Sequence, residues 1–408
     1  MRRILLSVIA LLASVAALAQ VLDKTLRVDY IFSGTDKTAQ IAVSSLSSFD
    51  GWAGRRVNMD QVPLKGNGQI CMADAASGKV LYRMSFSTLF QEWQATEEAT
   101  RTSRAFQNVF LLPMPENPVN ITVELYDLKG APAVSLTHPV DPSDILIRPL
   151  GDNPPRTVDI HRGGPSDKCI DIVIVPEGYT ASQMDLFLED CAKAWESFLS
   201  HEPFGSRQDS FNVYAALIPS NDSGVSVPRE GNWKDTAVAS HFDTFYSDRY
   251  LTTLQLFRLH DLLAGLPYEH VIILANSETY GGGGIYNSYE LTAAHHANFA
   301  PVVVHEFGHS FAGLADEYHY DDQFTEYYYP GIEPWEPNIT TMADFSSKWE
   351  DMMDLPEVGL FEGGGYQSKG VWRPASNCRM NTNTHPAFCP VCQRAIARMI
   401  DFYTVQDE

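Results

Sequence analysis

Hydrophobic and polar residues alternate along three stretches in the first third of the chain, residues 26–30, 80–86 and 121–125. Alternate side chains of an extended strand point to opposite faces, so a period of two predicts strands that are buried on one face. Glycine, aspartate and proline residues separate these stretches, as at the turn expected over residues 127–130. The pattern predicts an all-β sandwich domain over residues 20–145.

Residues 146–167 are rich in proline and glycine, which predicts a linker. From residue 168 continuous apolar runs, typical of strands buried on both faces, alternate with helical periodicity. This pattern predicts an α/β domain over residues 168–408. The predicted strands cover residues 169–175, 211–218, 270–275 and 285–291. The predicted helices, apart from the one discussed below, cover residues 182–200, 247–264 (ended by Gly265) and 393–402.

The first 19 residues have the pattern of a secretory signal peptide. Arg2 and Arg3 precede an apolar run over residues 4–17, and small residues follow at the expected cleavage site. The run is too short to span a bilayer, and no later apolar run is long enough to do so. We therefore expect an exported protein without a membrane span, in the periplasm of a bacterium or outside the cell.

Acidic residues strongly outnumber basic ones, with 51 Asp and Glu against 29 Lys and Arg and a formal net charge of −22. Such a surface repels phosphate groups, which argues against a nucleic acid partner. The length and the 44% hydrophobic content are those of a globular protein with room for two cores.

The chemistry is concentrated in residues 305–318, which read His-Glu-Phe-Gly-His-Ser-Phe-Ala-Gly-Leu-Ala-Asp-Glu-Tyr. Residues four apart in a helix share one face, so His305 and His309 can bind one metal ion. Glu306 is rotated about 100° from the first ligand, within reach of a metal-bound water, and is the candidate general base. Asn298 is the expected N-terminal cap of this helix.

Gly313 can adopt a left-handed conformation, end the helix and turn the chain back toward the metal. Asp316 then supplies a carboxylate that completes a ligand set of two histidines and one acid, which leaves a fourth position open as hydrolytic zinc sites require. Glu317 is adjacent and is the alternative third ligand. The pattern predicts one Zn²⁺ per chain.

These motifs resemble those of metzincin-type zinc metallopeptidases, and among them the IgA-peptidase family most closely, because an Asp followed by Glu-Tyr closes the motif. Residues 175–180, Tyr280 with the glycines after it, and residues 361–366 are also similar to that family. The usual metzincin glycine and third ligand would fall one position earlier, where Ala312 and Ala315 stand.

The resemblance implies a metzincin-like α/β (α+β) catalytic domain and a turn that places Met380 beneath the metal. It also implies that the strand at residues 285–291 pairs with an extended substrate, and the glycines at 281–284 would either let that peptide approach or form a flexible loop. Thr382 stands where some metzincins carry an assisting Tyr, so Tyr366 or Arg373 would substitute.

Three of the six cysteines, Cys378, Cys389 and Cys392, lie near the expected Met turn. In an exported protein Cys378 would form a disulfide with one of the other two, and a zinc knuckle that also uses His385 is the alternative. His295 and His296 are expected to be surface residues. An acidic stretch with Asp321, Asp322 and Glu326 offers either Ca²⁺ ligands or a solvated loop.

The function that these features predict is a secreted zinc endopeptidase that hydrolyses a polypeptide or glycoprotein substrate through a zinc-bound water activated by Glu306. Two alternatives remain open. One is an exported binding protein with a vestigial metal site, whose β domain does the binding. The other is an exopeptidase or amidase that acts on glycopeptides.

Overall fold

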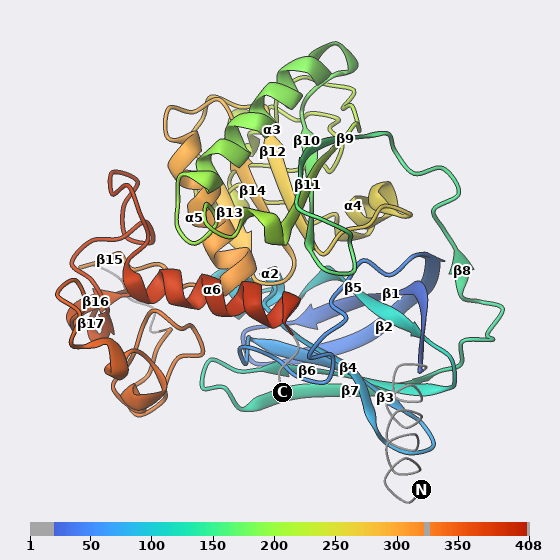
Figure 1. Cartoon of the computed structure of the whole chain (residues 1–408), viewed down its shortest axis with the longest axis horizontal. Coiled ribbons are helices and arrows are strands. Elements are labelled where there is room, and N and C mark those ends of the chain that lie inside the picture. The colour runs from blue at the N-terminus through green and yellow to red at the C-terminus, as the bar shows by residue number, and fades with distance from the viewer. Residues whose placement is uncertain (1–19, 322–326, 406–408) are drawn as a thin grey trace, which may run out of the picture.

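A computed structural model describes residues 20–321 and 327–405 of the chain (Figure 1). The expected signal peptide at residues 1–19 lies outside the described residues, as do Asp322 and Glu326 of the expected calcium loop. Among the helices in the described ranges, none combines the length and the apolar character needed to cross a membrane.

Two four-stranded sheets form the N-terminal part of the protein, in the orders β5-β1-β2-β8 and β4-β3-β6-β7. Side chains from both sheets meet in one apolar core, where Phe86 of β4 contacts Phe32 of β1 and Phe110 of β5 in the opposite sheet. The predicted alternation is present, since every second residue of β6 is buried. The strands are β1 Val21–Gly34, β2 Ala39–Asp50, β3 Gly68–Asp74, β4 Val80–Phe86, β5 Arg104–Pro115, β6 Val119–Tyr126, β7 Pro132–Val140 and β8 Arg148–Pro149. A short helix, α2 (Leu89–Gln94), connects β4 to β5 through a 3₁₀ turn.

A six-stranded sheet in the order β13-β14-β12-β10-β11-β9 forms the centre of the remaining chain. The four inner strands are parallel, and the two edge strands, β13 and β9, run antiparallel to their neighbours. The structure is thus of mixed α/β class, with an N-terminal β region. The strands are β9 Thr157–Arg162, β10 Ile170–Glu177, β11 Phe211–Ala216, β12 His270–Ala275, β13 Gly282–Ile285 and β14 Tyr289–Ala293.

Both faces of this sheet are covered, which explains why its inner strands are apolar throughout. Helices α3 (Met184–Leu199) and α5 (Phe299–Ala312) share one core with the first face. Helix α4 (Leu256–Leu263) and the N-terminal strands share the other core with the second face. Figure 1 shows α3 and α5 on the side of the sheet away from the N-terminal strands. The two halves of the chain therefore have a continuous apolar core.

The buried Arg27 side chain also joins the two halves. Arg27 of β1 donates to Asp29 on its own strand and to Asp261 and the Phe257 carbonyl of α4, at 2.6 to 3.1 Å. A guanidinium can satisfy several acceptors in a fixed geometry, so this contact sets the orientation of α4 against β1.

The last part of the chain adds a small sheet in the order β15-β17-β16 and the closing helix α6. Their bounds are β15 His319–Tyr320, β16 Phe361–Gly364, β17 Tyr366–Arg373 and α6 Pro390–Thr404. Helix α6 packs in the same core as α3 and α5.

Three sequence predictions differ from the structure. The helix predicted at 247–264 was too long, because β-branched residues such as Thr252 instead form bridges with neighbouring segments, and only Leu256–Leu263 is helical. The strand predicted at 285–291 is a hairpin, because the chain turns at Asn287 with φ of 52° between β13 and β14. The segment expected to be a linker contains the short strands β8 and β9.

Glu177 ends β10 with a buried carboxylate that accepts three hydrogen bonds, from Thr236 Oγ1 (2.6 Å), Val238 N (2.9 Å) and Ser240 N (2.7 Å). The Glu177→Gln substitution places an amide group against these donors. We expect it to lower the free energy of unfolding by about 1–3 kcal/mol in urea titrations. Glu278→Gln, at an exposed position, is the control and should leave stability unchanged. Equal stability of the two variants would contradict this role of Glu177.

Candidate metal centre and active site

The two histidines predicted on one helix face lie one turn apart on α5, with their Nε2 atoms 3.0 Å from each other. The Nδ1 atom of His305 lies 3.0 Å from the Arg379 carbonyl, and that of His309 lies 2.5 Å from the Leu314 carbonyl. A carbonyl only accepts, so each Nδ1 carries a proton, and Nε2 is the nitrogen available to bind a metal ion. This backbone support is typical of metal-binding histidines.

Gly313 ends α5 with φ of 60°, as the sequence predicts, and its N–H donates to the His309 carbonyl. The chain then returns so that Asp316 Oδ1 lies 3.0 Å from Nε2 of His305 and 3.3 Å from Nε2 of His309. Glu317, the alternative ligand, faces a different group of side chains. Of the two acids, the structure brings Asp316 to the histidines.

The Oδ1 atom of Asp316 is buried, and among the described residues it has no hydrogen-bond partner. Burial raises the pKa of this carboxyl, but the neighbouring His309 and His305 side chains outweigh that effect and lower it. A carboxylate oxygen and two imidazole lone pairs thus converge on one point. Such a set of donors fits a zinc ion.

Glu306 extends from the same helix, and one of its oxygens lies within 4.8 Å of a ring nitrogen of each histidine. Burial raises the pKa of Glu306, while the two neighbouring imidazoles partly oppose that shift. A carboxylate with a raised pKa beside a ligand set is suited to accept a proton from water and to release it again.

The glycines of β13 allow α5 to lie directly against the hairpin. A Cβ atom at Gly282 would lie 2.8 Å from Glu306 Oε1, and one at Gly284 would lie 2.2 Å from the Glu306 carbonyl oxygen. In the structure these glycines therefore let β13 lie against α5. Of the two alternatives for these glycines, the flexible loop is wrong for residues 282–284, because they form a strand.

Met380 lies in a tight turn in which Asn381 N and Thr382 N both donate to the Cys378 carbonyl. Its side chain is fully buried against α5, since a Cβ atom at Gly308 would lie 3.0 Å from Met380 Sδ. Its carbonyl accepts a hydrogen bond from Glu317 N at 2.8 Å. The turn thus supports the segment that carries Asp316.

Of the two candidate assisting residues, the structure brings only Tyr366 to the histidine and aspartate group. The Tyr366 hydroxyl donates to Asp316 Oδ2 and so orients this carboxylate. Arg373 donates to the carbonyls of Glu362 and Gly363, at 3.0 and 2.6 Å, within the small sheet.

Two side chains near the site had no local sequence signal. Glu92 of α2 forms a hydrogen bond with the Tyr250 hydroxyl, and burial raises the pKa of Glu92 to about 7. The ring of Tyr250 lies against β13, 2.7 Å from where a Cβ atom of Gly283 would stand. The N-terminal region therefore contributes an acidic group beside the catalytic half, which only the tertiary fold reveals.

His295 also differs from its expected role as a surface residue. Its Nε2 atom lies 2.7 Å from Oδ2 of the buried Asp190, which also accepts a hydrogen bond from the Tyr179 hydroxyl. His296 stacks edge-on against Tyr280. Both residues lie outside the metal-binding group formed by α5.

The three cysteines expected near the Met turn lie together beside Glu317. Cys378 Sγ and Cys392 Sγ are 3.8 Å apart, and both cysteines are free thiols, as is Cys389. His385, the fourth residue of the predicted zinc knuckle, instead places Nδ1 2.7 Å from the Ala387 carbonyl.

The contact between β13 and α5 leads to a test. In Gly284→Ala the new methyl group must push α5 away from the hairpin, so we expect a loss of about 1–3 kcal/mol of stability. Because both histidines move with the helix, the protein should also bind less added zinc. Urea unfolding and elemental analysis measure the two effects. Gly364→Ala is the control, since its Cβ atom would lie no closer than 3.5 Å to its neighbours. Wild-type behaviour of Gly284→Ala would contradict the close packing.

Comparison with protein families gives two matches that together cover most of the chain. The family model described as Peptidase M64 N-terminus matches residues 19–136, and that described as IgA Peptidase M64 matches residues 158–355 and 354–400. A search of curated proteins found no match. These matches confirm the resemblance seen in the sequence motifs: the chain belongs to the IgA Peptidase M64 family and has the N-terminal region of that family ahead of its peptidase part.

Proposed function

We propose that this peptidase is an exported zinc-dependent endopeptidase of metzincin-like type, with one catalytic Zn²⁺ per chain held by His305, His309 and Asp316. One observation carries this proposal: Nε2 of both histidines and the buried Oδ1 atom of Asp316 converge on one point. Among the described residues, that oxygen has no hydrogen-bond donor. Without a cation, such a group leaves a buried acceptor unsatisfied, which costs free energy.

When bound, zinc would act as a Lewis acid that lowers the pKa of a water molecule and polarises the scissile carbonyl. Glu306 would accept the proton of the attacking water and deliver it to the leaving nitrogen. Its raised pKa supports both steps, because a carboxylate with a higher pKa accepts a proton from water more readily. Tyr366 would fix Asp316 through their hydrogen bond.

A polypeptide substrate follows from the peptidase family. We propose that it binds in an extended form along β13, the edge strand of the sheet that lies against α5. The family name mentions IgA, but the residues of this chain described above do not identify an immunoglobulin substrate. A glycoprotein substrate and export through the N-terminal 19 residues are parts of the proposal that follow from the sequence alone.

The presence of Glu306 beside the ligand set favours hydrolysis over a vestigial metal site in a binding protein. The Glu306→Gln substitution should keep bound zinc, because this residue is no ligand, and should lower kcat/KM on a protein such as casein by about a hundredfold to ten-thousandfold. Elemental analysis and the release of soluble peptides measure the two properties.

His305→Ala is the matched variant and should lose both zinc and activity. A chelator should likewise abolish activity in the wild type, and added zinc should restore it. Casein cleavage by Glu306→Gln at the wild-type rate would contradict the assignment of the base. Product masses from a defined peptide distinguish the proposed internal cleavage from removal of terminal residues.

A further inference from the structure

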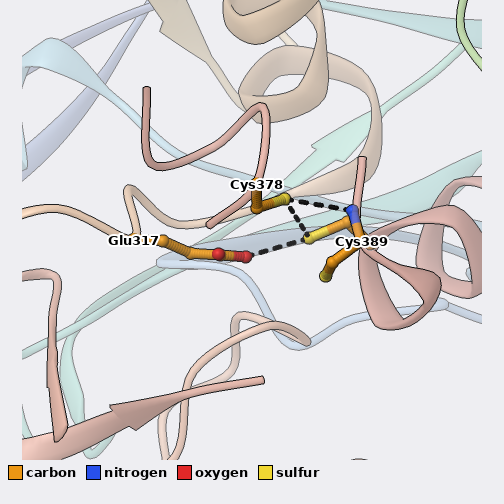
Figure 2. A group of neighbouring side chains, drawn as sticks. Glu317, Cys378 and Cys389 are labelled. Atoms are coloured by element: carbon orange, nitrogen blue, oxygen red, sulfur yellow. Dashed lines mark hydrogen bonds between the residues drawn. The ribbon is translucent and has the colours of Figure 1, made fainter. Parts of the chain in front are cut away.

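A second group of metal-ligating side chains lies next to the first. Cys378 comes from the Met turn, Cys389 and Cys392 come from the start of α6, and Glu317 comes from the segment after α5. One donor atom from each residue lies within 4.8 Å of all the others, and all four residues are buried. Figure 2 shows the labelled Glu317, Cys378 and Cys389 side chains meeting from three separate segments.

The Glu317 carboxylate in this group is incompletely satisfied. Its Oε1 atom accepts hydrogen bonds from Asn338 Nδ2 at 3.0 Å and from Cys392 Sγ at 3.1 Å. Its Oε2 atom is fully buried and, within the described part of the chain, lacks a hydrogen-bond partner. A buried carboxylate oxygen without a donor costs free energy, so this group of side chains is suited to bind a cation.

Two of the three cysteines lie at the N-terminal end of α6. Cys389 is the residue before the first turn of α6, and Cys392 lies within that turn, where the helix dipole and free N–H groups stabilise negative charge. The Cys389 N–H donates to Cys378 Sγ at 3.2 Å.

We propose that Cys378, Cys389, Cys392 and Glu317 bind a second, structural Zn²⁺. Three thiolates and one carboxylate are a donor set for a borderline ion such as zinc, and four protein ligands form the closed coordination of a structural site. Binding of the ion releases the three thiol protons. Glu317 takes the fourth position that the sequence had suggested for His385.

A disulfide would leave two of the four side chains in this group without a new partner. Cys378 Sγ and Cys392 Sγ are 3.8 Å apart, so a bond between them would require only a small movement. That bond would, however, leave the Cys389 thiol and the Glu317 carboxylate buried with no new partner. A zinc ion uses all four donors at once.

The second site is connected to the first through the backbone. Glu317 follows Asp316 directly, and its N–H donates to the Met380 carbonyl. The Met turn begins at Cys378, and the carbonyl of Arg379 in that turn supports His305. The second ion would therefore hold both Asp316 and the Met turn in place. This coupling rests on the proposed function, whereas the second site itself does not.

Metal counting on the full chain, purified without chelators, tests the proposal. The wild type should contain close to two zinc ions per chain, and both Cys378→Ser and His305→Ala should contain close to one. Cys71→Ser is the matched control at a half-buried cysteine of β3 and should keep both ions. If the site of His305, His309 and Asp316 binds no zinc but the cysteine site does, the wild type should contain one ion. That ion should be absent from Cys378→Ser and present in His305→Ala. If Cys378→Ser holds as much zinc as the wild type, the second site is wrong.

A measurement on the wild type covers the case in which Cys378→Ser does not fold. Alkylation followed by mass mapping should modify Cys378, Cys389 and Cys392 only after a strong chelator has removed zinc. Replacement of zinc by Co²⁺ should also produce thiolate-to-cobalt charge-transfer absorption. Modification before chelation, or modification that requires a reductant because a disulfide is present, would overturn the proposal.

Discussion

Two adjacent buried carboxylates constrain the peptidase half of this protein. Asp316 faces the imidazoles of α5, and Glu317 faces the three cysteines at the start of α6. Each acid has a buried oxygen that no donor among the described residues satisfies. Because a buried carboxylate oxygen without a donor costs free energy, a segment with two such acids in succession is suited to contact a cation at each acid. The position of this segment is then the feature on which both sites depend.

The surrounding elements hold that segment from several sides. Gly313 turns the chain after α5, the Met380 carbonyl accepts from Glu317 N, and the Tyr366 hydroxyl binds Asp316. Glycines in β13 let the hairpin contact α5 directly. The N-terminal sheets add a continuous apolar core behind the six-stranded sheet, as well as the Glu92 side chain that reaches Tyr250. The scaffold therefore stabilises the site through both halves of the chain.

Local patterns in the sequence predict the elements whose structure depends on local chemistry. The spacing of His305 and His309 gives their common face, Gly313 marks the end of the helix, and continuous apolar runs indicate the buried strands β10 and β12. The sequence left the choice between Asp316 and Glu317 open because both are acids in an irregular segment. Their different surroundings arise from α5 and α6, which are far apart in the sequence. The hairpin at Asn287, the short α4 and the role of Glu92 likewise depend on tertiary contacts that no local period encodes.

The central claim is that a cation binds between His305, His309 and Asp316. X-ray diffraction from crystals of the purified protein, recorded on both sides of the zinc absorption edge, tests it most directly. We expect an anomalous difference peak in contact with Nε2 of both histidines and with the Asp316 carboxylate. Absence of that peak in a protein that cleaves peptides, or a peak bound by Glu317 in place of Asp316, would contradict it.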